Sequence, residues 1–125
     1  MSLRNYQFKT ISVAYDFAEV GGAISTINLG VGVDINTTFV FGQIITTTNL
    51  ASAGAATVQL VGLNSGAILS PAFAFGTLIT GTPLPIITSA TLPVADNVAI
   101  VIGGAALTAG KFIILWNVTK IETNE

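Results

Sequence analysis

The chain has 125 residues, and its composition excludes several kinds of chemistry. Lys and Arg number 4 and Asp and Glu number 6, so charged residues make up 8% of the sequence, against about 25% in an ordinary soluble domain. It contains no Cys and no His, which removes disulfides, thiol nucleophiles, imidazole catalysis and most zinc sites. The net charge is −2 and no basic stripe exists, so we expect no nucleic-acid partner.

The first half of the sequence predicts four strands, because apolar and polar residues alternate in it with the period of two of a half-buried strand. These strands span residues 11–17, 27–33, 39–48 and 57–63. One face of the first strand carries Ile11, Val13, Tyr15 and Phe17. Turn signals close the first and the fourth strands, Gly21-Gly22 after the first and Asn64-Ser-Gly66 after the fourth.

The second half is less regular. Residues 71–75 and 77–80 predict short strands or extended loop, and residues 86–88 and 90–92 predict an edge element. The segment 82–86 is excluded from the centre of a sheet because Pro83 and Pro85 have no N–H to donate. The last two predicted strands are residues 98–102 and 111–121.

The strand at 111–121 is apolar on both faces. Phe112, Ile114, Trp116 and Val118 share one face, and Ile113 and Leu115 lie on the other. A strand of this kind is typical of the centre of a sheet with protein on each side, so we expect both of its faces to be covered.

These strands predict an all-β fold, a single-domain antiparallel β-sandwich or jelly roll of about 7–9 short strands. We expect one domain over residues 1–125, with 1–9 as an N-terminal arm and 120–125 as a C-terminal tail. The apolar stretch 98–116 is long enough for a membrane helix. Lys111 lies within it, at a cost of about 2.5–3.5 kcal/mol near a helix centre, and Gly103 and Gly104 predict a turn. We therefore expect no membrane partner.

Carboxylates offer the first candidate site. Asp16 and Glu19 are the closest acidic pair, and with Asp34 and Asp96 they could supply part of a calcium site. The spacing matches no calcium-binding motif, so we favour the simpler interpretation of a solvated strand end that enters a Gly turn.

Other candidates are weaker. A Ser or Thr nucleophile with Lys111 or Lys120 as its base lacks the Ser-x-x-Lys spacing. The glycines at 30–32 and 103–104 do not complete a dinucleotide motif. A sugar-stacking platform could be built from Trp116, Phe112 and Tyr15, but alternating strand positions favour a core role. We predict no catalytic, cofactor-binding or metal-ligating residue and no cofactor.

The distribution of charge suggests a partner of another kind. Residues 35–95 contain no charge of either sign and are rich in Thr and small residues. Such a surface loses little solvation when it is covered, as expected of a subunit that contacts other subunits. It also leaves the edges of the sheets without charged side chains to prevent pairing with other chains.

Three segments resemble small virion structural proteins of tailed bacteriophages. They are residues 15–30 (YDFAEVGGA followed by TINLG), 57–66 (TVQLVGLNSG) and 105–112 (AALTAGKF), in the same order as in that family. Some members of the family are capsid decoration (cement) proteins. The resemblance implies a non-enzymatic protein on the capsid surface of a virion that binds the major capsid protein and associates with itself, with a trimer favoured.

Three alternatives remain at this point. The chain could be a tail, baseplate or head-fibre subunit. It could also be a carbohydrate-binding module, which requires Trp116 or Tyr15 to be exposed, or a small membrane protein.

Overall fold

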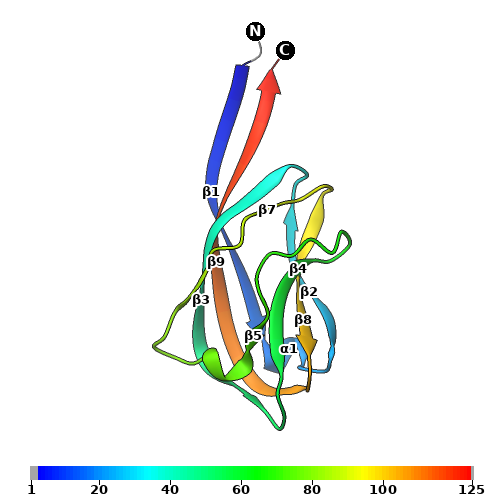
Figure 1. Cartoon of the computed structure of the whole chain (residues 1–125), viewed down its shortest axis with the longest axis vertical. Coiled ribbons are helices and arrows are strands. Elements are labelled where there is room, and N and C mark those ends of the chain that lie inside the picture. The colour runs from blue at the N-terminus through cyan, green and yellow to red at the C-terminus, as the bar shows by residue number, and fades with distance from the viewer. Residues whose placement is uncertain (1–2, 125) are drawn as a thin grey trace.

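Two antiparallel sheets pack face to face, as the alternating strands predict (Figure 1). The computed structural model describes the backbone of residues 3–124 and the side chains of residues 9–120. Sheet A has the order β1-β9-β3-β6, with β7 also paired to β3. Its strands are β1 (Leu3–Asp16), β9 (Leu107–Asn124), β3 (Thr37–Ser52), β6 (Leu84–Ile86) and β7 (Ala90–Thr91).

Sheet B completes the sandwich with the order β2-β8-β4-β5. Its strands are β2 (Ser25–Val33), β8 (Asp96–Gly103), β4 (Thr57–Gly62) and β5 (Phe73–Ala74). The helices are α1 (Phe17–Val20), which leads from sheet A to sheet B, and the 3-10 turn η1 (Phe75–Thr77). The fold is therefore the predicted all-β sandwich.

The core lies between the sheets and is built from one face of each strand. Sheet A contributes Val13, Tyr15, Phe39, Ile44, Phe112, Ile114, Trp116 and Val118, and sheet B contributes Val58, Leu60, Val98, Ile100 and Ile102. All of them are at most 2% exposed. Burial of this kind supplies most of the favourable free energy of folding.

Trp116 is the largest of these side chains, and a glycine makes room for it. Its ring meets Phe39 edge-on, with ring centroids 4.9 Å apart. Gly42 lies opposite it in the register of β3 and β9, and a Cβ at that position would collide with the indole ring. The indole Nε1 has no hydrogen-bond partner among the described residues.

The four strands predicted in the first half are confirmed, with corrections to their bounds. β1 begins at Leu3 and not at residue 11. β3 continues to Ser52, beyond the predicted end at residue 48. Phe17 does not belong to the first strand, because the side chain of Asp16 accepts a hydrogen bond from the N–H of Ala18 at 3.0 Å and starts α1 instead. An N-cap of this kind favours a helical turn over a continued strand.

The prolines behave as predicted, since β6 is an edge strand in which Pro85 lies opposite Gln43 of β3. Of the extended segment predicted at residues 71–75, only Phe73 and Ala74 form a strand. The stretch proposed and rejected as a membrane helix, residues 98–116, forms β8, a turn and much of β9. In the described part of the chain, no helix has the length and apolarity to span a membrane.

The predicted arm and tail pair with each other. β1 and β9 are antiparallel from Leu3 opposite Asn124 to Asp16 opposite Lys111. At one end this ribbon extends beyond the sandwich and brings both chain ends to its tip (Figure 1). Residues 1, 2 and 125 of the predicted arm and tail lie outside the described residues.

Candidate interaction surface

Two of the segments that carry the family resemblance, residues 15–23 and 105–112, contact each other. The Tyr15 and Phe112 rings stack with centroids 5.2 Å apart. The N–H of Leu107 donates to the carbonyl of Gly22 at 2.7 Å, and a Cβ at Gly22 would collide with Leu107. These contacts join the start of β9 to the connection between the sheets.

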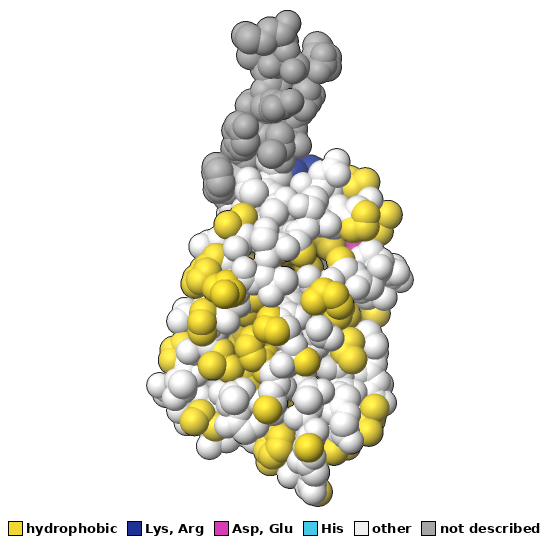
Figure 2. All heavy atoms as spheres, in the orientation of Figure 1, with side chains coloured by type: hydrophobic (Ala, Val, Ile, Leu, Met, Phe, Trp, Pro, Cys, Tyr) yellow, Lys and Arg dark blue, Asp and Glu magenta, His cyan; other side chains and the backbone are white. Residues whose placement is uncertain are grey.

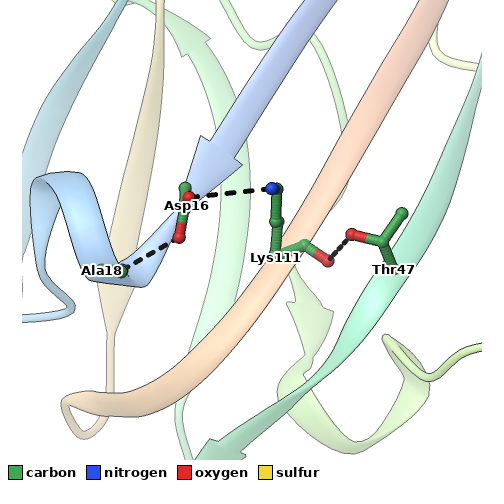
Figure 3. Close-up of polar contacts among 4 residues, drawn as sticks. All are labelled: Asp16, Ala18, Thr47 and Lys111. Atoms are coloured by element: carbon green, nitrogen blue, oxygen red, sulfur yellow. Dashed lines mark hydrogen bonds and ion pairs between the residues drawn. The ribbon is translucent and has the colours of Figure 1, made fainter.

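Asp16 and Lys111 add an ion pair to this junction (Figure 3). Lys111 Nζ lies 3.8 Å from Asp16 Oδ2, and the two side chains are 50% and 25% exposed. On the other side, the hydroxyl of Thr47 donates to the carbonyl of Lys111 at 3.3 Å. An exposed ion pair stabilises a fold by about 0–1 kcal/mol, so its main effect is to cancel two charges at this end of sheet A.

Tyr15 has a structural environment. Its hydroxyl donates to the carbonyl of Gly21 at 2.7 Å. Burial, and secondly the negative charge of Asp16, raise the pKa of Tyr15 to about 12. The phenol therefore stays neutral and acts as a hydrogen-bond donor that closes the Gly turn.

The four carboxylates of the calcium alternative have separate roles. Asp16 caps α1, Glu19 is exposed on that helix, and Asp34 lies 3.3 Å from Lys120. Asp96 accepts hydrogen bonds from the backbone N–H groups of three residues, Asn64, Ser65 and Asn97, at 2.8–2.9 Å. Within the described residues, no group of three or more acidic side chains is placed to hold a metal ion.

Asp96 instead anchors the turn that follows β4. Its side chain is 5% exposed. Burial alone would raise the pKa of Asp96, but the hydrogen bonds from Ser65, Asn64 and Asn97 outweigh that effect and lower it to about 2. Hydrogen bonds from backbone N–H groups stabilise the charged form of a carboxylate. Here they also fix the turn at Asn64 and Ser65 against Asp96.

The remaining candidates are also accounted for by structure. Both lysines considered as bases lie beside carboxylates, Lys111 near Asp16 and Lys120 near Asp34. The proposed sugar platform is absent from the surface, since Trp116, Phe112 and Tyr15 are 0% exposed. This burial removes the condition on which the carbohydrate-binding alternative depended.

In each of the two glycine pairs, one glycine has a positive φ that other residues rarely adopt. Gly30 has a φ of 79° at the irregularity between Asn28 and Val31 of β2. Gly104 has a φ of 77° in the turn between β8 and β9, where its backbone approaches Ala55 closely. Gly30 and Gly32 lie within β2, and β9 follows Gly103 and Gly104, so neither pair has the helix N-terminus that a phosphate-binding loop requires.

The face of sheet A that points away from sheet B is the strongest candidate surface. We call it the outer face, and it consists of Thr10, Ser12 and Ala14 of β1, Ile113, Leu115 and Asn117 of β9, Phe41, Gln43 and Ile45 of β3, and Pro85 of β6. Phe41 is 44%, Leu115 38% and Ile45 36% exposed. The prediction that both faces of the strand at 111–121 are covered is therefore wrong for this chain alone, because no described element covers the second face.

None of the residues of the outer face is charged. Charges adjoin it along its strands at both ends, with the Asp16–Lys111 pair at one end and Lys9, next to Thr10, at the other. The side of the molecule drawn in Figure 2, which includes other parts of the surface, likewise shows scattered hydrophobic side chains and almost no charged ones. The surface of the described part is thus uncharged over large areas.

Comparison with known proteins supports the fold. A chain in a structure described as "Acidic stable capsid structure of Helicobacter pylori bacteriophage KHP30" matches with a TM-score of 0.67 and 10% identity, over 100% of this chain and 99% of that one. A chain in "Capsid of Ralstonia phage GP4" matches with a TM-score of 0.61 and 12% identity, over 91% and 84%. A chain in "Cyanophage Pam1 capsid asymmetric unit" has a TM-score of 0.50 and 14% identity, over 93% and 84%.

No protein-family model and no curated protein matches the sequence. In each of the three capsid structures, the likeness extends over most of a chain of similar length. The chain therefore has a β-sandwich fold that also accounts for most of a small chain in each of three phage capsid structures.

Proposed function

We propose that this chain is a virion structural protein that decorates the outer surface of a phage capsid and stabilises it through oligomeric protein–protein contacts. The observation that carries the proposal is an uncharged, partly apolar sheet face left uncovered on a fold found in small chains of phage capsids. The side chains that the sequence offered as candidates for chemistry, such as Tyr15, Asp96 and Lys111, make structural contacts instead.

The mechanism is thermodynamic. A protein that binds the assembled shell and not its separated subunits stabilises the shell by mass action. This role makes and breaks no covalent bond, so it does not require the Cys and His side chains that the sequence lacks. We favour a trimer bound to the major capsid protein, since a closed ring of copies would cover part of the uncharged surface.

A tail, baseplate or head-fibre subunit is the second candidate. An uncharged surface suited to subunit contacts supports this role equally well. The two roles differ in where the protein lies on the particle, which a direct image resolves.

The test compares virions with and without this chain. The first measurement is cryo-electron microscopy of both particles, and the second is the temperature at which each releases its genome. We expect extra density on the outer shell and a higher release temperature when the chain is present. Unchanged shell density and an unchanged release temperature would contradict the decoration role, and density on the tail would favour the second candidate.

The purified chain provides a matched control. Added back to shells that lack it, it should sediment with them and restore their heat stability, whereas an unrelated uncharged β-sandwich of similar size should do neither. Binding that the control protein reproduces would show nonspecific adsorption and contradict the proposal.

A further inference from the structure

We infer that the outer face of sheet A is where copies of this chain contact one another around a shared symmetry axis. The inference deepens the proposed function, on which it rests for the assembled state, by naming the surface and its occupant.

Three apolar side chains of this face are exposed, namely Phe41, Ile45 and Leu115. The register places the residues of the face in three rows across β1, β9 and β3, namely Thr10–Asn117–Phe41, Ser12–Leu115–Gln43 and Ala14–Ile113–Ile45. Each row sets an apolar side chain beside short or amide side chains. Removal of such side chains from water is favourable, and the uncharged neighbours add little desolvation cost.

The lack of charge on the face favours a second copy of this chain as the occupant. Residues that lie near a rotation axis come close to their own equivalents in the other copies, so a charge at such a position would meet like charges. The residues of the outer face carry no charge. At one end Asp16 and Lys111 neutralise each other, with Oδ2 and Nζ 3.8 Å apart, and at the other end the one adjoining charge in β1 is that of Lys9. A partner recognised by charge would find no complementary group on this face, whereas a second copy of the face meets no repulsion.

The relief of the face also suits interlocking copies. The register of β3 and β9 shifts between Phe39 and Phe41, where Val40 has no partner in β9. Val40 is 48% exposed and Phe41 is 44% exposed. A β-bulge commonly redirects side chains in this way. Beside it lies a hollow of about 400 Å³, lined by Lys9, Thr10, Val40, Asn117 and Val118, so a projecting aromatic side chain and a recess lie next to each other.

The size of the face sets the strength of the contact. Strands lie about 4.8 Å apart and rise about 3.4 Å per residue, so four strands over six residues cover about 400 Å². A stable interface takes about 800 Å² from each partner. The flanking surface can supply more, because Ile87, directly after β6, is 77% exposed. We therefore expect self-association that depends on protein concentration.

The experiment measures self-association of the full chain by sedimentation equilibrium. The disrupting variant is Leu115→Glu, at the middle of the face, and the matched control is Ile24→Glu, since Ile24 is 60% exposed in the loop after α1. We expect the wild type and Ile24→Glu to associate with equal affinity and Leu115→Glu to associate at least about tenfold more weakly, a change of about 1.4 kcal/mol. Circular dichroism checks that both variants are folded.

A mixing experiment tests whether equivalent faces meet. Leu115→Lys should also be impaired alone, and a mixture of Leu115→Glu with Leu115→Lys should regain association because opposite charges then face each other. A mixture that stays dissociated would overturn the shared axis. Association of Leu115→Glu equal to that of Ile24→Glu, or a wild type that is monomeric at its highest soluble concentration, would overturn the inference as a whole.

These outcomes separate this inference from the proposed function. A wild type that is monomeric but still binds and stabilises shells leaves the decoration role intact and removes the inference. A wild type that associates through the outer face but binds no shell supports the inference and contradicts the decoration role.

Discussion

The two faces of β9 differ in what covers them, although both are apolar at their centres. On the inner face, Ile114 and Trp116 are 0% exposed beneath sheet B. On the outer face, Leu115 is 38% exposed and no described element lies over it. The difference shows that an apolar face of a strand need not be covered by the strand's own chain.

The two faces therefore contribute to different free energies. Full burial of one Ile or Leu side chain contributes about 1.5–3 kcal/mol, and on the inner face this gain stabilises the fold. On the outer face the same gain is only partly realised in the single chain and is available for association. Substitutions on the inner face should change unfolding, and substitutions on the outer face should change assembly.

The largest expected effect is the loss of stability when a core side chain of β9 is shortened, compared with the loss at its neighbour on the outer face. Ile114→Ala should lower the free energy of unfolding by about 3–4 kcal/mol, since it leaves a cavity in the core. Leu115→Ala should lower it by less than about 1 kcal/mol, because this side chain is already partly in water. Denaturant unfolding followed by the fluorescence of Trp116 measures both, at concentrations where the protein is dissociated. Equal losses would abolish the distinction between the faces.

A smaller effect sharpens the description of the inner face. Gly42→Ala should destabilise the fold by about 2–3 kcal/mol, because the added methyl group collides with the Trp116 ring in a packed core. Gly76→Ala is the matched control, since a Cβ there meets nothing within 4 Å. Thermal unfolding of the two variants provides the measurement. A Gly42→Ala protein as stable as Gly76→Ala would mean that Trp116 is not held against β3.

The smallest of the three effects extends the comparison to charged groups. Asp96→Asn should lower the free energy of unfolding at neutral pH by about 2 kcal/mol, because backbone N–H groups lose a charged acceptor. Asp34→Asn, whose side chain is 72% exposed, should change it by less than about 0.5 kcal/mol. Urea unfolding at pH 7 compares the two, and equal effects would contradict the anchoring role of Asp96.

The pH dependence follows from the same carboxylate. The pKa of Asp96 is lowered from 3.8 to about 2 in the folded state, so its contribution is fully present above the unfolded value and is lost as pH falls toward about 2. Between about pH 5 and pH 2, the free energy of unfolding should therefore decline less steeply in Asp96→Asn than in the wild type. Parallel declines would contradict this assignment.

Local patterns predicted much of the fold. Alternation identified β2, where Ile27 and Leu29 are half-buried and Asn28 is exposed. It also identified the core face of β9. Interactions between distant residues were harder to predict, because they leave no local pattern. The pairing of Leu3 with Asn124 and the hydrogen bonds from residues 64–65 to Asp96 are of this kind.

The candidate surface was predictable only in part. The uncharged run at 35–95 and the apolar second face of the strand at 111–121 both indicated contact with other protein. Alternation reports that a face is adapted to burial, but it does not distinguish burial by the same chain from burial by another. Only the exposure of Phe41, Ile45 and Leu115 in the folded chain separates the two cases.

The position of β9 also constrains how the protein folds during synthesis. β2, β4 and β8 of sheet B have all been made by Gly103. In sheet A, by contrast, β1 and β3 each pair with β9 and have no central strand between them until residues 107–124 have followed. Such long-range pairing folds slowly, and strands with free edges are prone to join other chains. Sheet A is therefore the half of the sandwich most exposed to misassembly on the ribosome.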